Sequence, residues 1–250
     1  MNLQEFFKEN PRVALAFSGG VDSSYLLYAA VRYGAQVQPY YVKTAFQPMF
    51  EYEDAIRLEQ SIGVKLSTLE LDVLSDPKVA ANPSNRCYFC KRCIFTAIAD
   101  AARADGFTVL LDGTNASDDS SDRPGMKALQ ELKVLSPLRL CGLTKDAIRR
   151  LSREAGLFTW NKPAYACLAT RIPSGRTITS ADLERTERCE AYLMQLGFSG
   201  FRIRLMGDSA KLEMPESQMA TLIEKREDVL RFLKGNYEKV FLDLEARSEQ

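Results

Sequence analysis

A stretch of nine residues at 16–24, AFSGGVDSS, separates a short apolar run from a segment with helical spacing. The apolar run at residues 12–17 predicts a strand, and the apolar side chains spaced along residues 21–33 predict a helix. The paired glycines allow a tight turn that presents backbone N–H groups, and the serines add hydroxyl donors. Because the N-terminus of a helix also carries partial positive charge, the stretch predicts a phosphate-binding loop.

The loop at residues 18–24 is not the P-loop of kinases, because the chain contains no Gly-Lys-Ser or Gly-Lys-Thr triplet. It resembles the SGGxDS signature of the PP-loop pyrophosphatases. That resemblance implies that ATP is cleaved between its α- and β-phosphates, that a substrate oxygen is adenylylated, and that the loop holds the pyrophosphate. The residues assigned to the ATP phosphates are Ser18, Gly19, Gly20, Asp22, Ser23 and Ser24, with Asp22 also a candidate Mg²⁺ ligand.

Strand-like and helix-like segments alternate through the first half of the chain. Further strands are predicted at residues 36–42, 64–71, 108–111 and 133–138, and helices at 52–62, 91–104 and 144–155. Such alternation predicts an α/β fold with a doubly wound, mostly parallel sheet, in which ligands bind beyond the carboxyl ends of the strands.

A smaller C-terminal α+β domain is predicted after residues 157–177, which show no clear period. Its expected helices span residues 180–196 and 215–231, and its expected strands span 200–205, 210–213 and 239–244. We place the boundary near residue 175. The prediction is a PP-loop domain at 1–175 and a substrate or oligomerisation domain at 176–250.

A second loop, Asp112-Gly113-Thr114-Asn115, follows the strand expected at residues 108–111 and continues through the acidic stretch 118–125. Its position at the same edge of the sheet suits contact with a nucleotide or Mg²⁺. We expect Gly113, Thr114 and Asn115 to border the nucleotide. The alternative is an ordinary solvated loop rich in Asp and Ser.

The composition restricts the chemistry open to this chain of 250 residues. The absence of histidine excludes His-dependent metal sites, Ser-His-Asp hydrolysis and imidazole general bases. The 33 basic residues balance 33 acidic ones, which argues against nucleic acid as a partner. No apolar run has the length of a membrane span, and the N-terminus lacks the order of a signal peptide, so we expect a cytoplasmic protein without a membrane partner.

Six cysteines need an explanation other than structural disulfides in a reducing compartment. Cys87 and Cys90 form a C-x-x-C motif, expected on a loop that leads into a helix, and Cys167 lies far along the chain. The residues alone leave open a redox pair, a zinc site that recruits Cys93 or Cys141, and an iron–sulfur cluster. We interpret Cys141 and Cys189 as small core residues, and Cys93 as a spectator that shares a helix face with Cys90.

The longer motifs resemble the LarE family of ATP-dependent sulfur transferases, within the PP-loop ATP pyrophosphatase superfamily. The matching stretches are AFSGGVDSS, NRCYFCK, DGTN with the later DRPG, SPLRLCGLTKDAIR, KPAYACLATRIPSG and LGFSGFRIRLMGDSAKLE. The resemblance implies that a carboxylate of a pyridinium dicarboxylate mononucleotide is adenylylated with release of pyrophosphate. The resemblance further implies that sulfur is then inserted into the adenylylated carboxylate, which gives a thiocarboxylate for nickel-pincer nucleotide cofactor biosynthesis.

Members of that family differ in their source of sulfur. In one type a single cysteine, at the position of Cys167, gives up its own sulfur. In the other type this cysteine and a C-x-x-C pair hold a [4Fe–4S] cluster. Because the chain contains Cys87 and Cys90, it resembles the cluster type, which implies the cofactors ATP, Mg²⁺ and [4Fe–4S], a sulfide donor and a homo-oligomer.

Three further residues near Cys167 are candidate substrate ligands. Arg171 and Lys162 are expected to contact the adenylate or a substrate phosphate, and Trp160 to stack on a ring. The alternatives are surface charge and core packing. The rival functions are a PP-loop tRNA thiolase and a synthetase that adenylylates its substrate and uses ammonia.

Overall fold

The computed structural model describes residues 1–118 and 124–248, and its chain forms two compact units. The first unit contains Met1–Val73 and Asn85–Lys162, and the second contains Leu74–Ser84 and Pro163–Gln250. The boundary expected near residue 175 lies inside the second unit. The stretch 119–123, which includes part of the DRPG motif, lies outside the described residues.

A four-stranded parallel sheet forms the centre of the first unit. Its order is β3-β2-β1-β4, with β1 at Arg12–Ala16, β2 at Gln36–Lys43, β3 at Ser67–Glu70 and β4 at Leu110–Leu111. All three pairings are parallel, so the strands end at the same edge of the sheet. This arrangement confirms the predicted α/β fold class.

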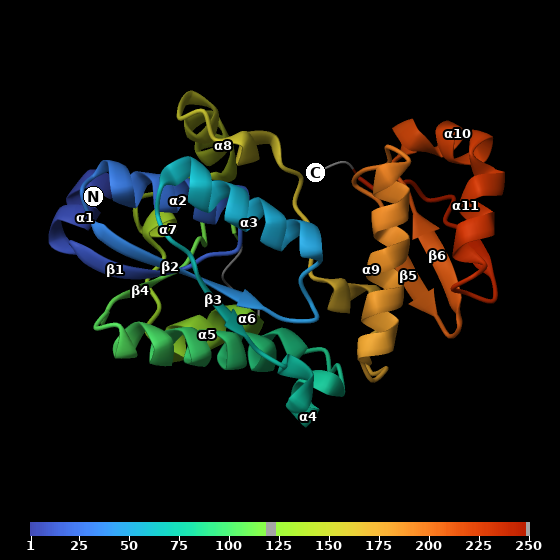
Figure 1. Ribbon diagram of the computed structural model, residues 1–250, viewed down its shortest axis with the longest axis horizontal. Helices are drawn as coiled ribbons and strands as arrows, with labels where there is room; N and C mark the ends of the chain where they lie inside the picture. The colour runs from blue at the N-terminus through green and yellow to red at the C-terminus, as the bar shows by residue number, and fades with distance from the viewer. Residues whose placement is uncertain (119–123, 249–250) are drawn as a thin grey trace. The chain divides into compact units, whose positions relative to one another are not determined.

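Helices cover both faces of this sheet (Figure 1). One face packs against α1 (Leu3–Glu9), α2 (Val21–Arg32), α3 (Met49–Ile62) and α8 (Lys145–Glu154), and the other against α5 (Arg86–Ala104) and α6 (Pro124–Glu131). Successive side chains along a strand point alternately into these two cores. In β1, Val13 and Leu15 face the first core and Ala14 faces the second, as the period of two along a strand requires.

The predicted start of α8 is confirmed by its cap. The Thr144 side chain accepts a hydrogen bond from the Ala147 amide, which satisfies one of the open donors in the first turn. Gly156, with φ +71, follows the helix in the left-handed conformation that favours glycine.

The C-x-x-C motif was wrongly expected on a loop. Helix α5 begins at Arg86, before both cysteines, rather than at residue 91. Its N-cap is Asn85, whose side chain makes no capping hydrogen bond, so the usual sequence signal for a helix start is weak here. Cys87, Cys90 and Cys93 are therefore spaced by three along the first turns of one helix.

The fifth strand expected at residues 133–138 is also absent from the described part of the sheet. Only the single bridge between Leu111 and Leu135 forms there. Lys133 adopts φ +55, and Pro137 has no amide hydrogen for a ladder and begins the short helix α7 (Pro137–Leu140).

The second unit is a small mixed sheet with helices. Its strand order is β5-β6-β7, at Arg202–Met206, Ser209–Glu213 and Val240–Leu242, with β5 antiparallel and β7 parallel to β6. Helix α9 spans Ser180–Gln195. The single helix expected at 215–231 is two helices, α10 (Glu216–Glu224) and α11 (Arg226–Leu233), separated at Lys225, whose ammonium donates to the Leu196 carbonyl at 2.8 Å.

An early segment, 74–84, belongs to this second unit. It contains the short helix α4 (Pro77–Ala80) and the last two residues of the 3₁₀ turn η1 (Val73–Ser75). The amide of Ile178 donates to the Ala80 carbonyl, and the amide of Gly175 to the Asn82 carbonyl, both at 2.8 Å. No helix among the described residues combines the length and apolar character needed to cross a membrane.

Candidate functional site

The predicted phosphate-binding loop connects β1 to α2 at the carboxyl edge of the sheet. Gly19 has φ +71, and a Cβ added there would lie 3.2 Å from the Glu51 carbonyl oxygen of α3. Both the backbone conformation and the close approach of α3 therefore favour glycine. Gly20 is the N-cap of α2, so the open amides of the first helical turn face the loop.

Serine hydroxyls hold the loop in this conformation. The Ser23 hydroxyl accepts from the Ser18 amide at 3.3 Å and lies 3.1 Å from the Ser18 hydroxyl. The Ser24 hydroxyl donates to the Gly20 carbonyl at 2.7 Å. These bonds fix the backbone before any ligand arrives, which reduces the entropy lost on binding phosphate.

Asp22 is paired with a lysine that the sequence analysis missed. The Lys145 ammonium lies 2.5 Å from Asp22 Oδ2, and Asn115 Nδ2 donates to Asp22 Oδ1 at 3.4 Å. Lys145 comes from the first turn of α8, far along the chain. Its sequence signals were its place in the SPLRLCGLTKDAIR stretch and directly after the Thr144 cap, and neither identifies its partner.

The loop after β4 lies against the start of α2, as its expected place at the sheet edge requires. A Cβ added at Gly113 would lie 3.0 Å from the Ser23 amide nitrogen. Asp112 is buried and accepts from the Ser136 hydroxyl at 2.6 Å and from the Thr114 hydroxyl. Buried Asp112 therefore holds the loop in place, and Asn115 reaches Asp22 from it.

Lys162 lies beside the phosphate-binding loop. Its ammonium donates to the Gly19 carbonyl at 3.3 Å and forms an ion pair of 2.6 Å with Asp54 on α3. The structure therefore places two lysines within reach of the loop, Lys145 from the start of α8 and Lys162 from the residue after a 3₁₀ turn. Asp54, unlike Lys145, lies outside the motifs quoted from the sequence.

Trp160 lies in the 3₁₀ turn η2 (Phe158–Asn161), next to α8. The Arg153 guanidinium lies 5.0 Å from the centre of its ring, a cation–π contact. Arg149 donates to the Trp160 carbonyl at 2.9 Å. These contacts belong to the first unit and leave stacking on a substrate ring as a prediction.

The motif cysteines of α5 differ in exposure. Cys87 is exposed, whereas Cys90 and Cys93 are half-buried. The buried Arg86 lies 3.7 Å from Cys87 Sγ and packs 5.3 Å from the centre of the Phe46 ring. Within residues 1–118 and 124–248, no three Cys, Asp or Glu side chains form a group that could hold a metal ion.

Cys167 is the half-buried N-cap of the 3₁₀ turn η3 (Leu168–Arg171) in the second unit. Its carbonyl accepts from the Thr170 amide at 2.9 Å and from the Thr170 hydroxyl at 2.8 Å. The cysteine therefore begins a closed turn whose last residue, Arg171, is almost fully buried.

The Arg171 guanidinium forms a two-pronged ion pair with Glu190 of α9, at 2.7 and 2.9 Å. Its remaining nitrogen donates to the Ala166 carbonyl at 3.0 Å and the Thr170 hydroxyl at 2.9 Å. Burial alone lowers the pKa of Arg171, but the bonds and charge of Glu190 outweigh it, so the pKa is raised. Arg171 thus fixes residues 166–170 to α9, while the contact with a phosphate expected from the sequence stays a prediction.

Replacing Glu190 with glutamine will lower the free energy of unfolding by about 3–5 kcal/mol, because an amide leaves the buried Arg171 charge without its counter-ion. Urea unfolding followed by circular dichroism measures the change. The control is Asp228→Asn, which breaks the exposed pair with Arg231 and will cost less than about 1 kcal/mol. Equal effects of the two variants would refute this account of the buried pair.

Cys189 is a core residue, as expected. It is fully buried on α9, and burial raises the pKa of its thiol to about 11. Cys141 is half-buried and packs against the core of the first unit, where burial also raises its pKa. Both thiols are therefore kept in the protonated, unreactive form at neutral pH.

Comparison with known proteins places the chain among enzymes of sulfur chemistry. An uncharacterized protein of Synechocystis is 37% identical, over 98% of this chain and 93% of its own length. The pyridinium-3,5-bisthiocarboxylic acid mononucleotide synthase of Lactiplantibacillus plantarum is 32% identical, over 95% of this chain and 87% of the synthase. The tRNA-specific 2-thiouridylase MnmA of Thermotoga is 26% identical over 60% of this chain and 54% of that enzyme.

The model of the family described as thiamine biosynthesis protein (ThiI) matches residues 9–194. This range includes the whole parallel sheet, the loop between β1 and α2, and the lysines beside it. Since the match covers most of the chain, the protein belongs to this ThiI-like family of PP-loop ATP pyrophosphatases, whose members include sulfur transferases.

Proposed function

We propose that the protein is an ATP-dependent sulfur transferase of the LarE family. Its substrate is a pyridinium dicarboxylate mononucleotide, and its product is the thiocarboxylate used to build the nickel-pincer nucleotide cofactor. The observation that carries the proposal is the loop at residues 18–24 with Asp22 and Lys145 beside it. The 32% identity to the L. plantarum synthase, over nearly the whole of this chain, supports the substrate class.

In the first step, a substrate carboxylate oxygen attacks the α-phosphorus of ATP, and the bond to the bridging oxygen of the β-phosphate breaks. Pyrophosphate leaves with the electron pair. In this proposal the loop amides and the Ser18 and Ser23 hydroxyls bind it, while the positive charges of Lys145 and Lys162 stabilise the negative charge that develops. In the second step, sulfur attacks the acyl carbon and AMP leaves.

Mg²⁺ fits the donor set of the loop, because Mg²⁺ prefers one or two carboxylates together with phosphate oxygens. Asp22 supplies the carboxylate, which is partly exposed and already paired with a cation. The chemistry that Mg²⁺ supplies when bound is neutralisation of phosphate charge.

The cluster part of the proposal rests on the chemistry of the cysteines, because the described residues contain no ready-made group of metal ligands. Cys87 and Cys90 lie one turn apart on α5, and neither is buried in the core, so both thiols are accessible for iron ligation. Cys167 is the third ligand that the proposal requires. When bound, a [4Fe–4S] cluster with three protein ligands supplies an iron that can carry a labile sulfide. This role implies an external sulfide donor, and a homo-oligomeric state stays part of the proposal.

The test is product analysis with purified enzyme, ATP and pyridinium-3,5-dicarboxylic acid mononucleotide. We expect AMP and pyrophosphate in equal amounts, and exchange of labelled pyrophosphate into ATP that depends on the mononucleotide. Formation of ADP would refute the cleavage between α- and β-phosphates. With sulfide present, the acid should gain sulfur, whereas an amide formed from ammonia would identify a synthetase.

A tRNA thiolase is the second candidate, because the Thermotoga 2-thiouridylase matches part of this chain. The balanced charge of the chain argues against it, since tRNA binding draws on an excess of Lys and Arg. Exchange of pyrophosphate that requires tRNA and ignores the mononucleotide would favour this second function.

A further inference from the structure

A cavity of about 240 Å³ opens between α2 and α8 in the first unit. Its lining residues on α2 are Tyr25, Tyr28, Arg32 and the helix-end residue Tyr33, and those on α8 include Leu151 and Glu154. The phosphate-binding loop, residues 18–24, includes the first turn of α2, and none of its residues lines the cavity. Arg32, at the far end of α2, lies about 12 Å along the helix from Ser24, so the rim of the cavity is separate from the residues assigned to the ATP phosphates.

One face of each helix forms the walls. Residues 25, 28, 29, 32 and 33 follow the i, i+3, i+4, i+7, i+8 spacing of a single helix face. Two helices that pack closely would bury such a face completely. Here Tyr25 is buried at the base, whereas Arg32 and Glu154 are exposed at the rim.

The charged and hydroxyl groups that line the cavity influence the tyrosine at its base. Burial raises the pKa of the Tyr25 hydroxyl, and the nearby hydroxyls of Tyr33 and Tyr28 raise it further. Arg32 lowers this pKa and Glu154 raises it, so both charges act on the same hydroxyl. Aromatic rings, a cation and an anion therefore surround one small space.

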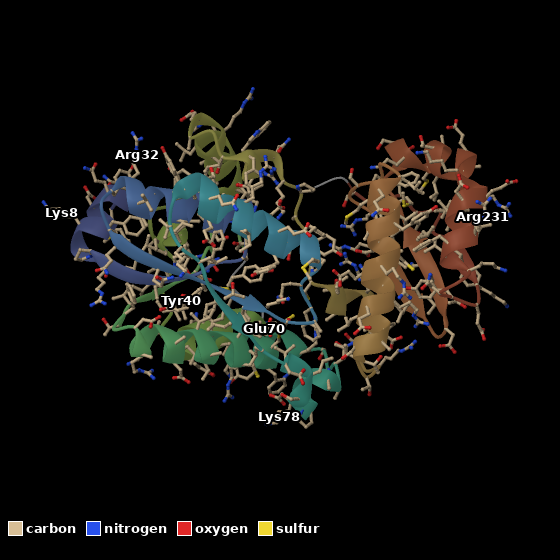
Figure 2. All side chains as sticks on the ribbon, in the orientation of Figure 1. Lys8, Arg32, Tyr40, Glu70, Lys78 and Arg231 are labelled. Carbon is tan, nitrogen blue, oxygen red and sulfur yellow. The ribbon has the colours of Figure 1, made fainter. Side chains whose placement is uncertain are left out.

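The two rim charges face the cavity separately. Arg32 donates to the Tyr28 hydroxyl at 3.2 Å, and the described structure contains no ion pair between Arg32 and Glu154. Figure 2 shows the labelled Arg32 at the surface of the first unit. A ligand that enters can thus meet a guanidinium and a carboxylate at once, without first breaking a bond between them.

We propose that this cavity binds a small aromatic zwitterion, of which a free aromatic amino acid is the simplest form. Its carboxylate pairs with the Arg32 guanidinium, which recognises carboxylates in a two-pronged way. Its ammonium pairs with Glu154, and its ring packs against the tyrosines. The volume is below the ~300–1,000 Å³ of pockets for drug-sized ligands, which limits the occupant to this size.

The test titrates the full chain with L-phenylalanine, followed by saturation-transfer NMR and isothermal titration calorimetry. A ligand of this size should bind with a Kd of about 1 mM or tighter. Two analogues each remove one charge: 3-phenylpropionate lacks the ammonium, and 2-phenylethylamine lacks the carboxylate. Both should bind about tenfold more weakly than phenylalanine.

Charge-removing variants assign each charge of the ligand to its partner. Arg32→Gln should weaken phenylalanine and 3-phenylpropionate about tenfold and leave 2-phenylethylamine unchanged, and Glu154→Gln should give the reverse pattern. Arg231→Gln is the matched control, because Arg231 is an exposed arginine on α11, outside the first unit, and should change nothing. Pyrophosphate release should be equal in all variants, which confirms that they fold.

Three results would overturn the proposal. The first is the absence of saturable phenylalanine binding to the wild-type chain. The second is an equal loss of binding in Arg32→Gln and Arg231→Gln. The third is a loss in Arg32→Gln that is the same for all three probes, since this pattern would show a structural effect rather than recognition of the carboxylate.

Discussion

Asp22→Asn will lower the rate of AMP and pyrophosphate formation by about 10²- to 10³-fold, because it removes the negative charge from the phosphate-binding loop. The asparagine keeps the size of the side chain and its contact with Asn115, but it cannot neutralise Mg²⁺ or Lys145. Asp22 is partly exposed, so the free energy of unfolding should change by less than about 1 kcal/mol. Pyrophosphate release under saturating ATP measures the rate, and urea unfolding measures the stability.

Two control variants separate the role of Asp22 from that of its partner. Asp146→Asn removes an exposed carboxylate from the residue next to Lys145 and should leave the rate within about twofold of wild type. Lys145→Met should raise the KM for ATP and lower kcat less than Asp22→Asn does. If Lys145→Met reproduced the full loss, Asp22 would serve only to position the lysine.

Replacing Cys87, Cys90 or Cys167 with alanine will each abolish multiple turnover and remove bound iron from protein purified without oxygen. The reason is that three thiolates are the smallest set that holds a [4Fe–4S] cluster while leaving one iron open to sulfide. Iron content and the absorption spectrum measure the cluster, and thiocarboxylate formed per enzyme measures turnover. Cys141→Ala, in the core region of the first unit, should retain both.

A sacrificial mechanism predicts a different pattern. Only Cys167 would then be needed for a first turnover, and Cys87→Ala would still give one product per enzyme. Mass spectrometry after reaction would show a chain lighter by roughly one H₂S, with dehydroalanine at residue 167. Under the cluster proposal the mass of the polypeptide does not change, so a dehydroalanine signal in reconstituted protein would refute it.

The sequence predicted the sheet and the loop well because their signals are local. The residues at 16–24 specify the strand, the turn and the helix start within a few positions, and the structure confirms the parallel sheet behind them. The position of the Asp112 loop followed from the rule that parallel strands end at one edge. Side chains that reach the loop from elsewhere carried no such signal.

The partners Lys145 and Glu190 show what sequence patterns leave open. Lys145 meets Asp22 across more than a hundred residues, and only the packing of α8 against α2 brings them together. Arg171 looked like a phosphate ligand by composition, but its burial against Glu190 depends on how α9 packs on η3. Charge that is buried by tertiary contacts cannot be distinguished from exposed charge by residue type or spacing.

Residues 74–84 have a consequence for how the chain is made on the ribosome. They are synthesised early, yet their hydrogen-bond partners, such as Gly175 and Ile178, lie after residue 162. At ~5–20 residues per second, the rest of the second unit emerges roughly 4–18 s after the first unit is complete. During that interval the Ala80 and Asn82 carbonyls lack their protein donors and hydrogen-bond to water instead. A chain stopped at residue 162 would therefore contain the complete parallel sheet, but residues 74–84, between β3 and α5, would lack these hydrogen-bond partners.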